Sequence, residues 1–325
     1  MALSVVIPTY NDVEILPETL DPLLRDDSTA EIVVVVDGSR DGSYEFLTEV
    51  ASRDERVRPF WIQNRGRAGA RQYGIERSRR EVVLMLDADV VARERLVSGH
   101  ARHHVSGRDR LVVGYMPPAI PPRRPGSFVL ERYAHEYERV CKSYEDDPAQ
   151  ILQRLWLGNV SVTRRALFAA GGCDAGAGVR YCEDVELGLR LAAARVDIEA
   201  SFHRGLRADH RFEQTVSGFL ETSRIVGEDL IKVARRHPGQ VSFPVWRKSG
   251  AVGAVARYAL RPRGHTVARR LGLMALTLAG RLHLWPLEHK IAGLLDRVEV
   301  QRGMQSAIRA LAGDAAPRTV RGQSG

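Results

Sequence analysis

Two aspartates that could bind a cation, Asp87 and Asp89, end the apolar run in the segment LMLDADV. On extended backbone, residues two positions apart point to the same side. Placing two carboxylates together is unfavourable unless a cation lies between or beside them. Their hard oxygen atoms suit Mg²⁺ or Mn²⁺, which leave coordination positions open for phosphate oxygens. The alternative is that one aspartate caps a following helix while the other is solvated, and the pair alone does not separate the two interpretations.

A third aspartate, Asp37, ends another apolar run in the segment VVVVDGSRDGS. If the run is a strand of a rigid sheet, its end holds this carboxylate where it can accept hydrogen bonds from a nucleobase edge or a ribose hydroxyl. The alternative is local: Asp37 or Ser39 caps the next helix, and Gly38 makes a tight turn. Taken alone, the segment favours the local alternative.

Acidic residues also gather in the segment YCEDVELGLRL. The apolar residues Val185, Leu189 and Ala192 recur at helical intervals. They predict a helix that begins near Glu183 and Asp184. The structural interpretation is that Asp184 is the N-cap and that Glu183 complements the positive end of the helix. A helix start also holds a carboxylate rigidly enough for catalysis, so the two roles are compatible.

The elements that would position these carboxylates follow from five β-rich runs in the first part of the chain. The runs are SVVIPTY, EIVVVVD, VRPFWIQ, EVVLMLDAD and RLVVGYM, and stretches of helical period separate them. This alternation predicts an α/β fold with a Rossmann-like, mostly parallel central sheet and helices on both faces. Because ligands bind beyond the carboxyl ends of such strands, residues 8–11, 37–39 and 87–89 should lie along one rim.

Several function classes lack their motifs in this sequence. The first β-rich run leads into PTYND without a glycine, which argues against the Gly-x-Gly-x-x-Gly turn of a nicotinamide enzyme. The cysteines, Cys141, Cys173 and Cys182, show no Cys-x-x-Cys spacing, so neither a disulfide framework nor a zinc knuckle is indicated. The N-terminus lacks the basic and long apolar stretches of a signal peptide. We therefore expect a cytoplasmic protein.

Taken together, these segments resemble the family 2 glycosyltransferases, which have the GT-A fold. The matching segments are VVIPTYND (5–12), VVVVDGSRDGS (33–43), AGARQYGIERS (68–78), LMLDADV (84–90), and LGNVSVTRRALFAAGGCD followed by YCEDVELGLRL (157–191). They occur in the family's order, and the resemblance covers roughly residues 3–235. It implies an inverting, hexosyltransferase-like enzyme that moves a sugar from a nucleotide-diphosphate sugar to an acceptor hydroxyl.

The resemblance implies a binding site for the donor. The nucleoside would lie among Pro8, Tyr10 and Asp37, with Asp37 on the base. Arg71 would face the nucleotide, where its charge suits phosphate or ribose contacts. The implied donor is a UDP-, GDP- or dTDP-sugar. The implied acceptor is a small molecule, a glycan or a lipid-linked compound, and no nucleic-acid partner is expected.

The resemblance also implies a divalent metal, Mn²⁺ or Mg²⁺. Asp87 matches the first acid of the family's metal motif, and Asp89 matches the direct metal ligand. His210 aligns with a histidine that commonly follows the last strand of the catalytic domain and can reach the metal or the diphosphate. His203 competes for the same role. A single histidine is more often a packed or surface residue than a ligand.

For the chemical step, the resemblance makes Asp184 the general base that takes the proton from the acceptor hydroxyl, while Glu183 helps to position the acceptor. Two alternatives stand beside this interpretation. A sugar-phosphate nucleotidyltransferase would need a Gly-x-Gly-Thr-Arg loop after the first strand, and the sequence has none there. A non-catalytic nucleotide-sugar-binding protein would have no need of the paired acids and Asp184.

The acceptor side is indicated less sharply. Residues between the metal motif and the base, among them Tyr133, His135 and Tyr137, line an acceptor pocket or form an ordinary covering helix. Asn159 lies in a segment of small residues, GNVSV, that matches a strand near the acceptor. It is a candidate substrate contact.

We predict one catalytic domain over residues 1–240. Residues 1–115 form its nucleotide-sugar-binding half, and residues 116–240 form its acceptor half. Residues 241–313 form a basic helical C-terminal region. Residues 314–325 have the composition of a disordered tail.

The C-terminal region carries the positive charge of the chain. The formal net charge is +8, whereas residues 246–325 hold 14 Lys and Arg against 4 Asp and Glu, which is +10 and leaves −2 for the remainder. Its apolar stretch LGLMALTLAG is about half of the roughly 20 residues that span a bilayer. The region can pack on the catalytic domain, form a homodimer contact, or lie peripherally on an anionic inner membrane face. Packing or dimerisation is slightly favoured over the membrane.

Overall fold

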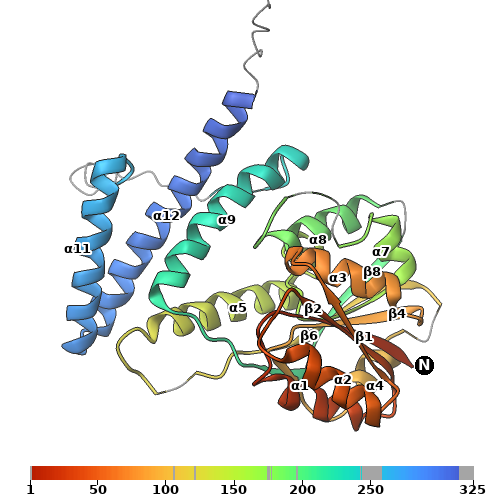
Figure 1. Ribbon diagram of the computed structural model, residues 1–325. Coiled ribbons are helices and arrows are strands. Elements are labelled where there is room, and N and C mark those ends of the chain that lie inside the picture. The colour runs from red at the N-terminus through yellow and green to blue at the C-terminus, as the bar shows by residue number, and fades with distance from the viewer. Residues whose placement is uncertain are drawn as a thin grey trace, which may run out of the picture. The chain divides into compact units, whose positions relative to one another are not determined.

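A computed structural model describes most of the chain, which divides into two compact units (Figure 1). The described residues are 2–104, 107–120, 122–173, 176, 178–194, 197–241, 243 and 258–314. The first unit comprises Met1–Arg123 and Val129–Gln214. The second unit comprises Arg124–Phe128 and the chain from Thr215 onward.

The first unit is built on an eight-stranded sheet. In chain order the strands are β1 (Leu3–Thr9), β2 (Thr29–Asp37), β3 (Val57–Ile62), β4 (Val82–Leu86), β5 (Val90–Ala92), β6 (Asp109–Tyr115), β7 (Asn159–Thr163) and β8 (Ile198–His210). Their spatial order is β3-β2-β1-β4-β7-β6-β8-β5. Strands β3, β2, β1 and β4 are parallel, and β7 is antiparallel to both β4 and β6. Strand β8 is parallel to β6, and β5 is antiparallel to β8.

Helices cover both faces of this sheet. They are α1 (Leu16–Leu24), α2 (Ser43–Arg53), α3 (Gly66–Arg77), α4 (Leu96–Arg102), α5 (Phe128–Asp146), α6 (Gln150–Gln153), α7 (Arg164–Ala169) and α8 (Glu183–Ala193). Leu16 of α1 packs in one apolar core with Val5, whereas Ile75 of α3 and Leu187 of α8 pack in another with Val6. Because successive residues of a strand point to opposite faces, neighbouring valines of β1 enter separate cores. The predicted α/β fold class is confirmed.

The five β-rich runs form β1 to β4 and β6, and β6 runs in the same direction as β4 but does not pair with it. Strand β7 lies between β4 and β6, antiparallel to both. Its residues from Asn159 to Val162 are buried, so β7 has the burial of a central strand although it comes late in the chain. The parallel strands β3, β2, β1 and β4 are therefore joined to β6 through β7.

The second unit consists of long helices. They are α9 (Val216–Arg236), α11 (Pro262–Arg281) and α12 (Trp285–Asp314). Helix α9 lies against α12 at two glycines. A Cβ at Gly227 would lie 2.0 Å from the carbonyl oxygen of Val300, and one at Gly303 would lie 1.9 Å from that of Arg224. Only glycine permits so close an approach of the two backbones.

The contacts of α9 differ from the predicted domain boundary. The sequence placed residues up to 240 in the catalytic domain, whereas α9 groups with the C-terminal helices because it packs along α12. Which residues the catalytic domain needs stays a prediction. Apart from Asp314 at the end of α12, the predicted tail 314–325 lies outside the described residues. In the described part of the chain, none of the helices combines the length and the apolar composition needed to span a membrane.

Candidate active site

The predicted rim lies at the carboxyl ends of three neighbouring strands. Asp37 is the last residue of β2, and Asp87 follows directly after β4. Tyr10 follows β1, the strand between them, while Pro8 is buried inside β1 opposite Val35. Because these strands are parallel neighbours, their carboxyl ends meet at one edge of the sheet. The fold therefore brings Tyr10, Asp37 and Asp87 to the same edge.

Asp37 is anchored by the loop after β3 and not by the helix after β2. Its Oδ1 accepts a hydrogen bond of 2.7 Å from the backbone N–H of Arg65, and Asp37 is buried. The first helical N–H of α2, at Ser43, donates to Asp41 at 3.1 Å. The capping alternative for Asp37 and Ser39 is therefore wrong. The role of Asp37 at a nucleobase stays a prediction.

Two exposed aromatic side chains lie near this edge. Tyr10 is 55% exposed after β1, and Trp61 is 48% exposed in β3. The Trp61 indole N–H donates to the carbonyl oxygen of Ser39 at 3.1 Å, and the Ser39 hydroxyl accepts from the N–H of Asn11 at 2.9 Å. The turn between them needs Gly38, whose φ is +82°. These bonds fix the loops, and exposed rings there suit stacking on a nucleobase.

Arg71, on α3, is buried among three carboxylates. It forms an ion pair with Asp87, and its Nη1 lies 3.6 Å from Oδ1 of Asp184 and 3.7 Å from Oε1 of Glu183. Burial alone would raise the pKa of Asp87, but the charges of Arg71 and Arg67 outweigh it and hold this pKa below its usual value. Arg71 thus connects the end of β4 with the start of α8. Its contact with a nucleotide stays a prediction.

Arg67 is a member of this cluster that the motifs did not indicate. Its Nε donates to Oε1 of Glu183 at 2.7 Å. Burial raises the pKa of Glu183 to about 7, and the neighbouring Asp184 adds to the increase while Arg67 and Arg71 oppose it. The signal in the sequence is the four-residue spacing of the two arginines, which places both on one face of α3.

Asp184 lies in the first turn of α8 but does not cap it. The N-cap position is Cys182, and Oδ2 of Asp184 accepts a hydrogen bond of 3.0 Å from the backbone N–H of Leu157. Its Oδ1 is buried and has no hydrogen-bond partner within the described residues. The predicted helix start is confirmed, whereas the capping interpretation of Asp184 is wrong. A carboxylate with one anchored and one unsatisfied oxygen can take up a proton.

A second polar group lies where β5 pairs with β8. Nε2 of His210 is 3.3 Å from Oδ2 of Asp89, and its Nδ1 is 3.1 Å from the hydroxyl of Tyr133. The backbone is fixed as well, since the N–H of Arg211 donates to the carbonyl oxygen of Asp89 at 2.7 Å. Burial, together with nearby carboxylates, raises the pKa of Tyr133 and keeps its hydroxyl protonated. Tyr133 therefore orients the ring of His210 from its far side.

Asp89 and His210 fit a divalent metal. Ligands at ~2.1 Å in octahedral geometry lie about 3 Å apart, so a separation of 3.3 Å suits two neighbouring ligands of one ion. The Asp89 side chain is partly exposed, which leaves room for water or phosphate oxygens at the other positions. The described residues contain no group of three or more His, Cys, Asp or Glu that could hold a metal.

Two residues suggested by the sequence make other contacts. The ring of His203 stacks on that of His103, with their centres 4.0 Å apart. Asn159 is buried in β7, where its amide N–H donates to the carbonyl oxygen of Leu206 and its Oδ1 lies 3.0 Å from Nε2 of His100. The structure thus brings His210, and not His203, to Asp89. Asn159 pairs with Leu86 at the end of β4, and these contacts occupy both polar groups of its buried side chain.

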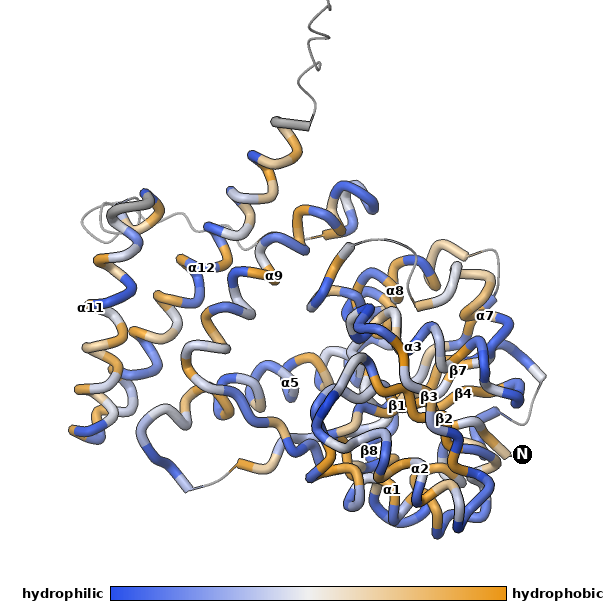
Figure 2. Tube along the Cα trace, viewed as in Figure 1, coloured by the Kyte–Doolittle hydropathy of each residue, from blue (hydrophilic) through white to orange (hydrophobic). Residues whose placement is uncertain are grey.

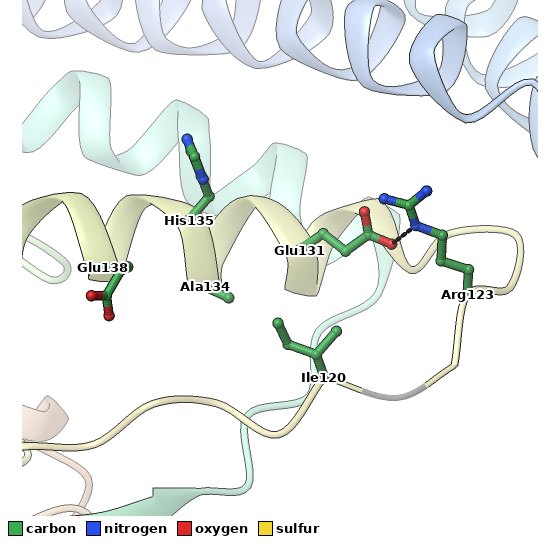
Figure 3. A pocket seen from close by; sticks show the side chains of 6 residues that line it. All are labelled: Ile120, Arg123, Glu131, Ala134, His135 and Glu138. Atoms are coloured by element: carbon green, nitrogen blue, oxygen red, sulfur yellow. Dashed lines mark hydrogen bonds and ion pairs between the residues drawn. The ribbon is translucent and has the colours of Figure 1, made fainter.

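An open pocket of about 420 Å³ lies between α5 and the connector that precedes it (Figure 3). It is lined by Ile120, Arg123, Glu131, Ala134, His135 and Glu138. Arg123 donates to Glu131 at 3.1 Å across one end of the pocket. Of the three residues predicted for the acceptor side, His135 lines this pocket. Tyr133 and Tyr137 pack instead in an aromatic group with Trp156.

Comparisons of sequence match the N-terminal part of the chain. Residues 4–156 match the family model described as "Glycosyl transferase family 2". The uncharacterized glycosyltransferase YfnE of Bacillus subtilis is 28% identical over 158 residues, which are 48% of this chain and 39% of that protein. Human dolichyl-phosphate beta-glucosyltransferase is 39% identical over 100 residues, which are 27% of this chain and 31% of that protein.

A third relative is the undecaprenyl-phosphate 4-deoxy-4-formamido-L-arabinose transferase of Pseudomonas aeruginosa. It is 44% identical over 98 residues, which are 27% of this chain and 28% of that protein. The matched segments thus span about two fifths or less of the length of these relatives.

Solved structures show the same fold at low sequence identity. The mannosyltransferase PcManGT of Pyrobaculum calidifontis, in complex with GDP-Man and Mn²⁺, superposes with a TM-score of 0.57 at 16% identity and covers 92% of this chain and 86% of that chain. S. aureus TarS 1-349 gives a TM-score of 0.50 at 12% identity over 96% of this chain and 92% of that chain. These likenesses define the fold as that of the GT-A class. In sequence, residues 4–156 are similar to the members of glycosyl transferase family 2.

Proposed function

We propose that this protein is an inverting glycosyltransferase that moves a sugar from a nucleotide-diphosphate sugar to an acceptor hydroxyl. The observation that carries the proposal is the pairing of Asp89 with His210 at 3.3 Å. Asp89 follows Asp87 by two residues, and Asp87 belongs to a buried charged group that we call the Arg71 cluster. Its members are Arg67, Arg71, Asp87, Glu183 and Asp184. One short segment after β4 thus contributes Asp89 to the proposed metal site and Asp87 to the buried cluster. Transfer with inversion needs both groups, one for the leaving diphosphate and one for the acceptor proton.

The donor is proposed to bind along the edge formed by Tyr10, Asp37 and Asp87. Tyr10 is exposed and can stack on the base, while the anchored carboxylate of Asp37 is positioned to accept from its edge. A UDP-, GDP- or dTDP-sugar fits this arrangement equally well. The GDP-Man bound by the mannosyltransferase of the same fold supports a sugar nucleotide as the donor class.

The metal would be Mn²⁺ or Mg²⁺ held by Asp89 and His210. When bound, such an ion neutralises charge that develops on the leaving diphosphate. Asp89 would supply a charged oxygen ligand, and His210 would supply its ring nitrogen Nε2. The hydroxyl of Tyr133 shares a hydrogen bond with the other ring nitrogen of His210, Nδ1. The Mn²⁺ in the structure of the mannosyltransferase supports this choice of ion.

Asp184 is proposed as the general base for the acceptor hydroxyl. Leu157 holds its Oδ2 by a backbone hydrogen bond, so the carboxylate keeps its orientation while Oδ1 takes the proton. Nη1 of Arg71 lies 3.6 Å from Oδ1 of Asp184. Glu183, bound by Arg67, is proposed to position the acceptor.

The acceptor is proposed to be a small molecule, a glycan or a lipid-linked compound. Two relatives are named for dolichyl phosphate and undecaprenyl phosphate, which supports the lipid-linked class. The pocket at α5 is lined by charged groups of both signs, with Arg123 beside Glu131 and Glu138. We propose that the protein works on the cytoplasmic side of a membrane.

A thermal-shift screen of nucleoside diphosphates tests the donor site. Ligand binding to the native state alone raises the apparent stability. We expect one diphosphate among UDP, GDP and dTDP to raise Tm with Mn²⁺ and to lose most of this effect in chelator. The matched control is Asp89→Asn, which should bind the diphosphate without the metal-dependent increment. No increase in Tm with any diphosphate would contradict the donor-site proposal.

A further inference from the structure

The outer face of α11 exposes a row of large apolar side chains. They are Val267 (46% exposed), Leu271 (60%), Met274 (68%), Leu278 (58%) and Leu282 just past the helix end (57%), and we call them the α11 stripe. Their spacing of four, three, four and four residues places them on one face of the helix. Soluble monomers rarely expose so continuous an apolar row, so the α11 stripe indicates an interaction surface.

The opposite face of α11 is already occupied. Leu276 and Ala279 are buried there, and a Cβ at Gly272 would lie 2.7 Å from Leu295 of α12. His265, in the first turn, is bonded to Glu299 of α12 at 2.8 Å. Helix α11 therefore packs on α12 through one face and remains apolar on the other. A helix that is apolar on both faces is buried on both sides in its working state.

The charge carried by α11 itself is of one sign. No Asp or Glu occurs between Asp229 and Glu288, while the same stretch contains eleven Lys and Arg. Arg270 and Arg281 are exposed on α11 itself, and helical periodicity places them along one side of the α11 stripe. Figure 2 shows hydrophobic residues recurring along α11 between hydrophilic ones. The surface is thus apolar along its centre and cationic at its border.

We propose that the α11 stripe docks on an anionic phospholipid surface. The leucines and Met274 enter the boundary between headgroups and acyl chains, while Arg270 and Arg281 bind phosphate groups. A second copy of the chain fits less well. Two stripes packed face to face would bring the arginines of both copies together with no acidic residue on either helix. Because none of the described helices can span a bilayer, α11 lies on the surface.

The test is binding to lipid vesicles, measured by flotation without any nucleotide. We expect the full chain to bind phosphatidylcholine vesicles that contain phosphatidylglycerol, and to bind pure phosphatidylcholine vesicles at least about tenfold more weakly. Raising the salt concentration should release the protein, because surface charge is screened. This assay needs no sugar transfer, so a failure of the proposed enzymatic function would leave its result unaffected.

Matched variants separate the α11 stripe from the rest of the surface. L271E/L278E should lower vesicle binding about tenfold or more, whereas I308E, an equally exposed apolar position on α12, should bind like the wild type. R270Q/R281Q should weaken binding to the anionic vesicles alone. Circular dichroism should show that all three variants fold. The proposal is overturned if the wild type does not bind anionic vesicles or if L271E/L278E binds them like the wild type. It is also overturned if light scattering shows a dimer that L271E/L278E abolishes while vesicle binding is absent.

Discussion

At the scale of single residues, the candidate site holds its carboxylates in two different environments. Asp89 is partly exposed and faces His210, which leaves room beside it for the proposed metal ion. Asp87 is buried against Arg71, which satisfies its charge within the protein. Two aspartates only two positions apart thus have separate roles: Asp89 is open to ligands, and Asp87 fixes the arginine that supports the proposed base.

Replacing the proposed base should separate binding from chemistry. In Asp184→Asn the amide oxygen can still accept from the N–H of Leu157, but the side chain cannot take a proton. We expect the rate of sugar transfer to fall by roughly 10² or more while donor affinity, measured by calorimetry, changes only a few-fold. The matched control is Asp27→Asn, an exposed aspartate, which should keep the wild-type rate. Near-normal transfer by Asp184→Asn would move the role of base to another residue, with Glu183 first.

At the scale of elements, the site is assembled from α3, the end of β4 and the start of α8. Arg71 and Arg67 project from one face of α3 to Asp87 after β4 and to Glu183 in α8. These elements lie far apart in the chain, and ion pairs between buried groups are costly to break once formed. The Arg71 cluster therefore fixes the start of α8 relative to the sheet.

The raised pKa of Glu183, at the start of α8, should make the stability of the folded protein depend on pH. The pKa of Glu183 rises from 4.5 to about 7, chiefly through burial and then through Asp184, against Arg67 and Arg71. Between about pH 4.5 and 7 the folded protein therefore keeps a proton that the unfolded chain releases, so the free energy of unfolding falls as pH rises through this window. Glu183→Gln lacks this proton. Urea unfolding at a series of pH values should show the decline in the wild type and a flatter curve in the variant, and parallel curves would contradict the pKa assignment.

The sequence predicted the strands of the fold and the edge that carries the candidate site correctly where the local apolar pattern agrees with the burial of the residues. The continuous apolar runs of β1, β2 and β4 predicted buried parallel strands, and the acids at their ends fell on one edge. The place of β7 was not predictable, because pairing between strands distant in sequence depends on the whole sheet. The burial of Arg71 was not predictable either, because a charged residue on a helix is usually solvated. Arg71 is buried because three carboxylates surround its guanidinium group.

At the scale of the whole molecule, the proposed chemistry and the proposed attachment belong to separate units. Every residue proposed to bind donor, metal or proton lies in the first unit, from Tyr10 to His210. The α11 stripe belongs to the second unit, and α11 itself carries four arginines and no acidic residue. A lipid-linked acceptor would give this arrangement a purpose, because the surface that holds the enzyme would also hold its substrate.

The most direct test of the central claim is hydrolysis of sugar nucleotides, which needs no acceptor. We expect the wild type with Mn²⁺ to release nucleoside diphosphate from one UDP-, GDP- or dTDP-sugar, and chelator to stop the release. Asp89→Asn replaces a charged ligand by a neutral one of similar shape, so release should fall by roughly 10² or more while the fold is kept. If Asp89→Asn, or the wild type in chelator, released the diphosphate at the full rate, the metal-assisted transfer proposed for this site would be contradicted.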